Sequence, residues 1–360
     1  MKEASLYIRE EERSVSCVLC HHQCSIKPGK RGRCGVRENR NGRLYSLVYG
    51  RLIAEHADPV EKKPLYHFLP ASRSYSISTV GCNFACQHCQ NYQISQYPQM
   101  HRGDIAGNLR TPEQVVRAAK QSDCQSISFT YVEPTGFYEF ASDCMQLARE
   151  QRLANIFVSN GYMTAACCQK LAPLLDGINI DIKSFSEKFY RTICKASLQP
   201  VLDSVCLLRE LGVWVEVTTL LIPGLNDSAE ELKKIASFLQ GVDPAIPWHV
   251  TGFHPTYKML DHVSTPASTL KKAWQIGLDA GLRFVYQGNI RSDNGANTLC
   301  PICHSKLILR SDFTVQHNRL LEGRCPQCME RIEGIWNISQ IFSGKKVRKN
   351  SSPDNCKGSV

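Results

Sequence analysis

Short apolar segments alternate with amphipathic segments along the middle of the chain. Seven of the apolar segments are rich in β-branched or aromatic residues, which is typical of buried strands. They are Tyr75–Val80, Ser126–Tyr131, Asn155–Ser159, Gly177–Ile182, Val213–Leu221, Trp248–Phe253 and Arg283–Gln287. A helical pattern lies between successive strands, and this βα repeat builds a parallel sheet, closed or partly closed. The sequence therefore predicts an α/β protein with a partial (β/α)6 barrel of the TIM type.

The helical segments carry recognisable starts. Thr111 precedes Pro112 and Glu113, so we expect Thr111 to be an N-cap and Pro112 to lie in the first turn. The other expected helices are Phe137–Gln151, Thr164–Leu175, Leu198–Leu211, Ser228–Leu239 and Pro266–Ala280.

Polar residues follow the predicted strands at the positions where they end. They are Glu133, Asn160, Asp181 with Lys183, Asn226 with Asp227, and His254. Any one of them is more often a helix cap or turn former than a functional residue. Because chemistry in such barrels gathers at the carboxyl ends of the strands, five in register predict a site.

Three cysteines directly follow the first predicted strand. Cys82, Cys86 and Cys89 are spaced Cys-x3-Cys-x2-Cys. A cubane cluster normally takes four thiolates, so three leave one iron open to a small molecule. This is the spacing of radical S-adenosylmethionine (SAM) enzymes, in which SAM occupies that iron. An incomplete zinc knuckle or packed cysteines are the alternatives; knuckles normally pair their cysteines, and this triplet has no near fourth partner.

Two further groups of cysteines flank the predicted barrel. Cys17, Cys20, Cys24 and Cys34 lie within eighteen residues, and zinc or a second iron–sulfur cluster both suit four thiolates. Near the other end, two Cys-x2-Cys pairs predict a zinc ribbon that stabilises a segment too short for its own core. These pairs are Cys300 with Cys303 and Cys325 with Cys328.

Composition narrows the class of protein. The 360 residues include 18 cysteines, and no secretory signal is visible at residues 1–13, so we expect a reducing compartment, the cytoplasm, and metal ligation rather than disulfides. No apolar run reaches the length of a membrane span. The net charge of +10 comes from the two flanks, where solubility is its usual explanation. We expect four regions: a cysteine-rich region 1–73, the barrel 74–296, the ribbon-like module 297–340 and a disordered tail 341–360.

From Cys17 to about Trp336, the chain closely resembles the radical SAM protein of the AmmeMemoRadiSam system, a relative of the pyruvate formate-lyase activating enzymes. The resemblance rests on Cys17-x2-Cys-x3-Cys24 and on a set of further motifs. These are Cys34-Gly-Val-Arg-Glu-Asn39, Gly81-Cys-Asn-Phe84, Cys89-Gln-Asn91, Ser128-Phe-Thr-Tyr131, Glu133-Pro-Thr135, Ser159-Asn-Gly161, Asp181-Ile-Lys183, Ile222-Pro-Gly-Leu-Asn-Asp227, Phe253-His-Pro255 and Asn297-Thr-x-Cys-Pro-x-Cys303.

The resemblance implies that Cys82, Cys86 and Cys89 hold a [4Fe–4S] cluster and that the Glu133 segment receives the amino group of SAM. It places Asn160, Asp181, Lys183 and His254 around the SAM pocket, where amide, carboxylate and cationic groups suit the polar parts of SAM. It also implies a flavodoxin- or ferredoxin-like electron donor, and Memo-type and AMMECR-type proteins as partners encoded nearby.

Two positions depart from the family pattern. His88 stands where an aromatic ring usually packs on the adenine, and Val132 stands where the family usually has Asn. The resemblance implies an enzyme that reductively cleaves SAM to a 5′-deoxyadenosyl radical, which abstracts hydrogen from an unknown substrate. An activase that places a glycyl radical on a partner protein is one alternative function. A non-catalytic metal-binding protein that engages nucleic acid or protein through its basic ends is another, although no basic stretch interleaved with aromatic residues favours nucleic acid.

Overall fold

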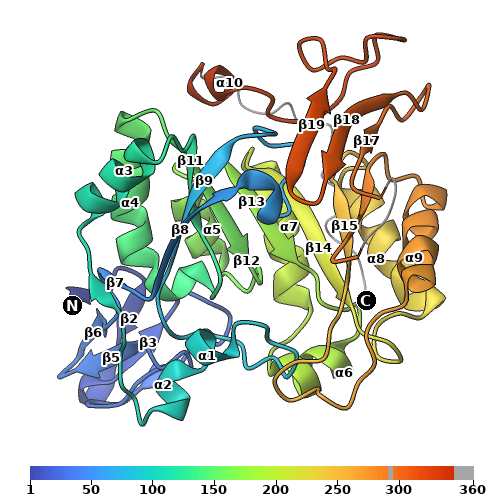
Figure 1. Ribbon diagram of the computed structural model, residues 1–360. Coiled ribbons are helices and arrows are strands. Elements are labelled where there is room, and N and C mark those ends of the chain that lie inside the picture. Colours follow the sequence, from blue (N-terminus) through green and yellow to red (C-terminus); the bar gives the residue numbers. More distant parts are fainter. Residues whose placement is uncertain (291–294, 344–360) are drawn as a thin grey trace.

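The structure, a computed structural model, describes residues 1–290 and 295–343, and an eight-stranded sheet forms its centre (Figure 1). The strand order is β16-β15-β14-β13-β12-β11-β9-β8. These strands are β8 (Ala54–Pro59), β9 (Arg73–Ser78), β11 (Ser126–Phe129), β12 (Ala154–Ser159), β13 (Gly177–Asp181), β14 (Trp214–Leu221), β15 (Trp248–Gly252) and β16 (Val285–Gly288). Strand β9 and strands β11 to β16 pair in parallel and correspond to the seven predicted strands. The predicted partial barrel is therefore confirmed.

One strand of the sheet was not predicted. β8 runs antiparallel to β9 and forms the sheet edge, with Ala54 opposite Ser78 and Pro59 opposite Arg73. Its sequence contains charged residues and a proline, which are tolerated at an edge and obscure a strand pattern. The sheet therefore begins at residue 54, inside the region that was assigned to the cysteine-rich segment.

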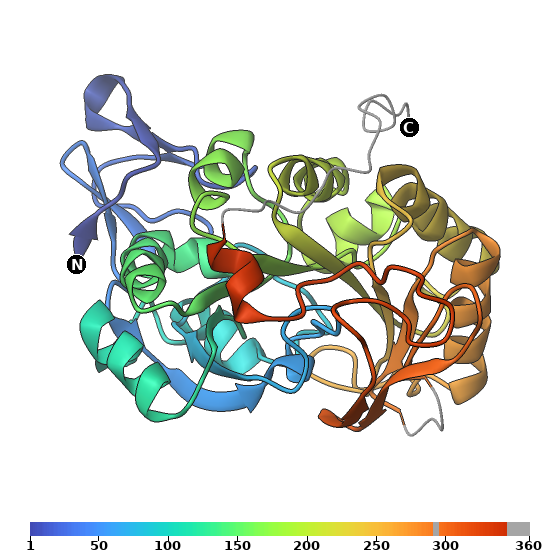
Figure 2. The same ribbon diagram turned by 90° about the horizontal axis from the view of Figure 1, so that it is seen from above.

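The expected helices follow the strands and lie on the outside of the curved sheet (Figure 2). They are α3 (Pro112–Gln121), α4 (Tyr138–Glu150), α5 (Ala165–Leu171), α7 (Gln199–Glu210), α8 (Ala229–Val242) and α9 (Ala267–Asp279). Thr111 caps α3 as predicted, because its hydroxyl accepts a hydrogen bond from the backbone of Gln114, whose side chain accepts one in return from Thr111. Shorter helical turns are η1 (Glu11–Arg13), η2 (Val60–Lys62), α1 (Tyr92–Ser95), α2 (Tyr97–Met100), η3 (Pro134–Phe137), α6 (Glu187–Phe189) and η4 (Tyr190–Cys194).

Small sheets form the two flanks. The first seventeen residues and residues 25–46 fold into two three-stranded sheets with the orders β1-β6-β5 and β2-β3-β4. Their strands are β1 (Lys2–Glu3), β2 (Tyr7–Arg9), β3 (Val15–Cys17), β4 (Ser25–Ile26), β5 (Arg37–Arg40) and β6 (Arg43–Ser46), and β7 (Arg51–Leu52) pairs with β10 (Asn108–Leu109). The second flank contains β17 (Thr298–Leu299), β18 (Lys306–Ser311), β19 (Thr314–Asn318) and α10 (Ile338–Phe342). Of the tail that was predicted to be disordered, 341–360, residues 341–342 belong to α10, so the prediction is wrong there, and residues 344–360 lie outside the described residues.

The segment from Val60 to Leu69 joins the sheet to the second flank. Phe68 packs with the first residues of β12 and β14 in a separate apolar cluster, and Ile335 of the second flank completes it. The buried carboxylate of Glu216 accepts hydrogen bonds from the backbone of Tyr66 and His67 at 2.9 and 2.8 Å. A buried carboxylate is stable only with such partners, so the segment is held in place from inside the sheet.

No helix among the described residues has the length and apolar character needed to cross a lipid bilayer. A large central apolar core lies between sheet and helices, and it also includes residues of the first flank such as Val15, Ile26 and Leu44. The first flank is therefore packed against the barrel as part of one core.

Arg310 of the second flank makes buried contacts with the segment between β8 and β9, and its replacement tests how much these contacts stabilise the protein. Its guanidinium is fully buried 3.7 Å from the Glu61 carboxylate, and it donates a 2.7 Å hydrogen bond to the Tyr66 carbonyl. Arg310→Ala would leave Glu61 buried without its cation, so we expect unfolding to require about 3–5 kcal/mol less free energy. Chemical denaturation measures this change. Arg319→Ala, at an exposed position of the same flank, is the control and is expected to change stability by less than about 0.5 kcal/mol; equal effects would contradict the assignment.

Candidate active site

A cavity of about 330 Å³ opens at the carboxyl ends of the parallel strands. Eight of the predicted site residues line it, although they come from four separate parts of the chain. They are Cys82, Cys86, His88, Cys89, Glu133, Asn160, Asp181 and Lys183. The structure thus brings these residues together in one place, as was expected for residues at the carboxyl ends of barrel strands.

The three cysteines lie on the loop between β9 and α1. Backbone hydrogen bonds fix this loop to η4: Ala85 donates to the Cys194 carbonyl and Gln87 to the Ile193 carbonyl, both at 3.1 Å. Gly81 starts the loop with φ of +90°, a conformation open to glycine at no steric cost. The backbone on either side of Cys86 is therefore positioned by η4.

Burial raises the pKa of the Cys82 and Cys89 thiols. A hydrogen bond with Cys194 and burial raise the pKa of Cys86. Lys183 opposes this rise at Cys86 and Cys89. Thiolates are the ligands of iron and zinc, and the positive charge of a bound metal would favour the thiolate form of these three residues. Cys194 lies outside the three predicted cysteine groups, and its sulfur is within 4.8 Å of ligand atoms of both Cys86 and His88.

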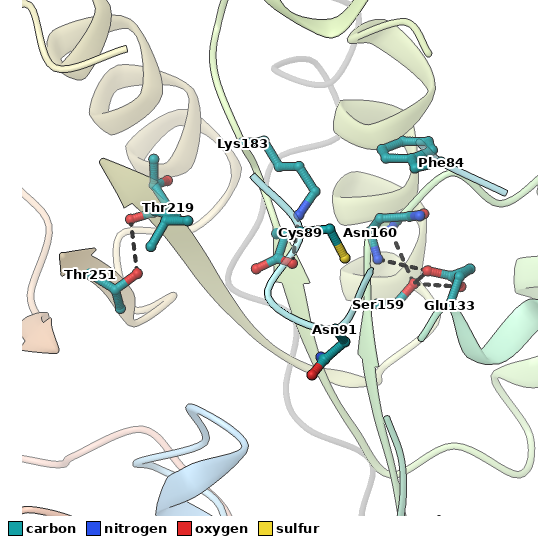
Figure 3. A network of polar contacts seen from close by, with 12 residues as sticks. Phe84, Cys89, Asn91, Glu133, Ser159, Asn160, Lys183, Thr219 and Thr251 are labelled. Atoms are coloured by element: carbon teal, nitrogen blue, oxygen red, sulfur yellow. Dashed lines mark hydrogen bonds and ion pairs between the residues drawn. The ribbon is translucent and has the colours of Figure 1, made fainter. Parts of the chain in front are cut away.

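A buried carboxylate connects the ends of β11 and β12 (Figure 3). Glu133 is 2% exposed, and its oxygens accept hydrogen bonds from the Ser159 hydroxyl at 2.9 and 3.0 Å and from the Asn160 backbone at 2.8 Å. The Thr135 backbone and hydroxyl donate to it as well. Burial raises the pKa of Glu133, and these donors oppose that rise. Because its side chain is fully engaged, Glu133 shapes the cavity wall rather than offering a free carboxylate.

Asn160 continues this network to the cysteine loop. Its side-chain amide donates a 2.7 Å hydrogen bond to the side-chain oxygen of Asn83, and its own oxygen accepts from the Tyr162 backbone at 3.1 Å. Asn83 follows Cys82 directly. The end of β12 therefore sets the position of the first ligand residue.

Lys183 and Asp181 form an ion pair in the cavity wall, with Nζ of Lys183 2.9 Å from a carboxylate oxygen of Asp181. Burial opposes the charge of Lys183, but Asp181 and the nearby thiols raise its pKa well above its usual value.

His88 is the neutral polar group of the cavity. Burial and then Lys183 lower the pKa of His88 to about 3, so its imidazole is neutral. Its Nδ1 is buried without a hydrogen-bond partner, which leaves a polar atom free for a ligand in the cavity.

His254 is placed differently from the other predicted residues. It is exposed and lies outside the set that lines the cavity, 3.3 Å from the carbonyl of Asn289 and 3.4 Å from the Ser264 hydroxyl. Asn289 itself lines the cavity. The role assigned to His254 stays a prediction.

Part of the cavity wall was not predicted. It includes Lys63, Tyr131, Thr218, Thr251 and Phe313. Tyr131 adopts a left-handed backbone conformation with φ of +67°, which is uncommon for a bulky residue. Its hydroxyl donates to the Asp58 carboxylate at 2.8 Å, and Lys63 donates to the same oxygen at 2.7 Å. Asp58 and Lys63 were not predicted because Asp58 lies in the unrecognised strand β8 and Lys63 in the short polar segment after it.

Both flanking cysteine groups assemble in space. Cys300, Cys303, Cys325 and Cys328 have all four sulfurs within 4.8 Å of one another. Cys17, Cys20, Cys24 and Cys34 line a single small cavity beside Asn83. Which metal each group binds stays a prediction.

Comparisons with known proteins agree with this geometry. The sequence profile of the Radical SAM superfamily matches residues 76–239. An uncharacterized protein of Methanocaldococcus jannaschii is 41% identical over 336 residues, which cover 92% of this chain and 99% of that protein. A second protein of the same organism, named as a candidate glycyl-radical enzyme activating enzyme, is 26% identical, with 59% of this chain and 80% of that protein covered. The pyruvate formate-lyase-activating enzyme of Clostridium pasteurianum is 20% identical, with 50% and 76% covered.

The fold and the three thiols that line its cavity agree with these comparisons. The chain belongs to the radical SAM superfamily, and it is related to glycyl-radical activating enzymes. Membership implies a [4Fe–4S] cluster and SAM. The residues fit both groups: three thiols, the free Nδ1 of His88 and the charged pair Asp181 and Lys183 line one cavity. The specific AmmeMemoRadiSam assignment goes beyond these comparisons.

Gly81 offers a test of how strictly the cysteine loop is positioned. An added Cβ would lie 2.8 Å from the Cys34 carbonyl oxygen and closer still to Val36, and φ of +90° disfavours any side chain. We expect Gly81→Ala to lower the free energy of unfolding by about 2 kcal/mol or more, and to release iron faster to a chelator after anaerobic reconstitution. Gly241→Ala is the matched control, because a Cβ added at Gly241 would have no neighbouring atom of this kind within 4 Å. Iron release at the wild-type rate from Gly81→Ala would contradict this view of the loop.

Proposed function

We propose that this protein reductively cleaves SAM and uses the resulting radical to abstract a hydrogen atom from a substrate bound in the same cavity. The observation that carries the proposal is the convergence of three thiols, a free imidazole nitrogen and the pair Asp181 and Lys183 around one space of about 330 Å³. When bound, the cluster and SAM supply an electron and a 5′-deoxyadenosyl radical. The chain supplies positioning and the exclusion of water.

Each side chain has a distinct task in this proposal. Cys82, Cys86 and Cys89 hold three corners of the cluster. Lys183, kept charged by Asp181 at 2.9 Å, is placed to pair with the carboxylate of SAM. The Glu133 segment presents its backbone to the amino group, while the carboxylate of Glu133 stays bound to Ser159 and Asn160.

Within the superfamily, we assign the chain to the AmmeMemoRadiSam type. The support is the set of motifs that spans the barrel and both flanks, from Cys17 to Cys303. The assignment carries Memo-type and AMMECR-type proteins as candidate partners, and a flavodoxin- or ferredoxin-like protein as the electron donor. These partners are proposals that follow from family membership.

The second flank is proposed to hold zinc. The Cys300 and Cys328 sulfurs are 3.5 Å apart, and those of Cys303 and Cys325 are 3.6 Å apart. Four sulfurs at about 2.3 Å from a tetrahedral zinc ion would lie about 3.8 Å from one another. The contribution of the ion would be to the folding of this flank.

SAM cleavage is the direct test of the function. After anaerobic reconstitution and dithionite reduction, the wild type is expected to form 5′-deoxyadenosine from SAM, measured by chromatography. Cys86→Ala removes one cluster ligand and is expected to abolish the product. Cys124→Ala changes a buried cysteine outside all three groups and is expected to keep it. An intact cluster in the wild type, seen by absorption and electron paramagnetic resonance, without any product would overturn the proposal.

A glycyl-radical activase is the second candidate, favoured by the two relatives named as activating enzymes. The expected result is then a stable glycyl radical on a partner protein, detected by electron paramagnetic resonance after incubation with enzyme, SAM and reductant. The Cys86→Ala enzyme is the control. If 5′-deoxyadenosine is formed with a small molecule and no protein radical appears with any glycyl-radical partner, hydrogen abstraction from a free substrate is retained and the activase is rejected.

A further inference from the structure

We propose that Cys17, Cys20, Cys24 and Cys34 hold a second [4Fe–4S] cluster, and that this cluster is ligated entirely by cysteine. The four residues come from the two small sheets of the first flank: Cys17 ends β3, Cys24 directly precedes β4, and Cys34 precedes β5. All four line the same cavity. The Cys17 backbone donates a 3.0 Å hydrogen bond to the Cys24 carbonyl, so the pairing of β3 and β4 brings these ligands together.

The spacing of the thiols favours a four-iron cluster over a single metal ion. In the second flank, four sulfurs lie within 4.8 Å of one another, as the ligands of one ion must. Among the described residues, neither the Cys17 group nor the loop of Cys82, Cys86 and Cys89 forms such a tight set. The ligands of a cubane bind different irons at its corners and are therefore more widely spaced. In this respect the first flank differs from the ribbon. In the cluster loop, Cys86 forms a tight set with His88 and Cys194 but not with Cys82 and Cys89.

Two residues that line the same cavity, Arg37 and Asn83, each have a buried nitrogen donor without an acceptor. Arg37 is 1% exposed, and its Nε has no hydrogen-bond partner, although its other nitrogens bind the Glu139 carboxylate at 2.8 and 3.3 Å. The side-chain nitrogen of Asn83, which also lines the cavity, is likewise without a partner. Buried donors normally have acceptors. The sulfides and thiolates of a bound cluster are acceptors, and hydrogen bonds to them tune its potential.

The proposed cluster lies directly beside the SAM site. His22 shares a 2.8 Å hydrogen bond with the carbonyl of Asn83, the neighbour of Cys82. The Cys34 carbonyl packs on Gly81, and Cys20 forms a β-bridge with Met163 close to the end of β12. Four protein ligands leave no iron open, so this cluster would not bind SAM. Its closeness predicts magnetic coupling between the two clusters when both are reduced.

Metal content after anaerobic reconstitution tests the proposal without any need for SAM turnover. We expect about eight irons and eight sulfides per wild-type chain, and about four of each in the Cys82→Ala, Cys86→Ala, Cys89→Ala triple variant, whose first flank is intact. The cluster kept by this variant should be reducible, and its electron paramagnetic resonance spectrum should not change when SAM is added. Cys124→Ala and Cys144→Ala, single changes of buried cysteines outside the three groups, are the matched controls and should keep about eight irons.

The reciprocal variant separates iron from zinc. Replacing Cys17, Cys20, Cys24 and Cys34 by Ser should remove about four irons and no zinc; if this variant does not fold, the triple variant of the SAM loop alone decides the result. A folded triple variant without iron, or a loss of one zinc and no iron from the quadruple variant, would overturn the proposal. A wild type with eight irons that does not cleave SAM would support this site and reject the proposed function, so the two can fail separately.

Discussion

The geometry of the cavity depends on one buried carboxylate. Glu133 accepts hydrogen bonds from the side chain of Ser159 and from the backbone of Asn160 and Thr135, and a charge at this depth is tolerated only because these donors replace water. Its bonds tie the end of β11 to the end of β12. Asn160 then donates a 2.7 Å hydrogen bond to Asn83 in the cysteine loop. The position of this loop therefore depends on a hydrogen-bond network at the carboxyl ends of the strands.

The cysteines show how one residue type serves different purposes through spacing and burial. In the ribbon, pairs of sulfurs lie 3.5 and 3.6 Å apart, a distance suited to one tetrahedral ion. In the loop after β9, the thiols are set apart around a cavity, as a polynuclear cluster requires. Cys144 and Cys167 are fully buried among apolar side chains, where a thiol behaves as a small hydrophobic group.

The sequence was most informative where local pattern and global fold agree. All seven parallel strands were predicted because strands buried on both faces are continuous apolar runs, and the cap at Thr111 was predicted because its chemistry is local. β8 was missed because an edge strand can be polar and contain proline. The closeness of Cys194 to Cys86 was not predicted because it depends on the docking of η4 on the loop, a tertiary contact without any local signal.

Residues of the barrel, of the segment before it and of the second flank all line the cavity. The cysteine loop, Glu133, Asn160 and Lys183 all belong to the βα repeat and line the cavity. The lining also includes Lys63 from the segment between β8 and β9 and Phe313 from the second flank. Thr218 on β14 lines the cavity as well, and its buried hydroxyl lacks a partner. Since a barrel of this kind supports many reactions, we expect substrate choice to depend on residues such as these three, one of which comes from the second flank.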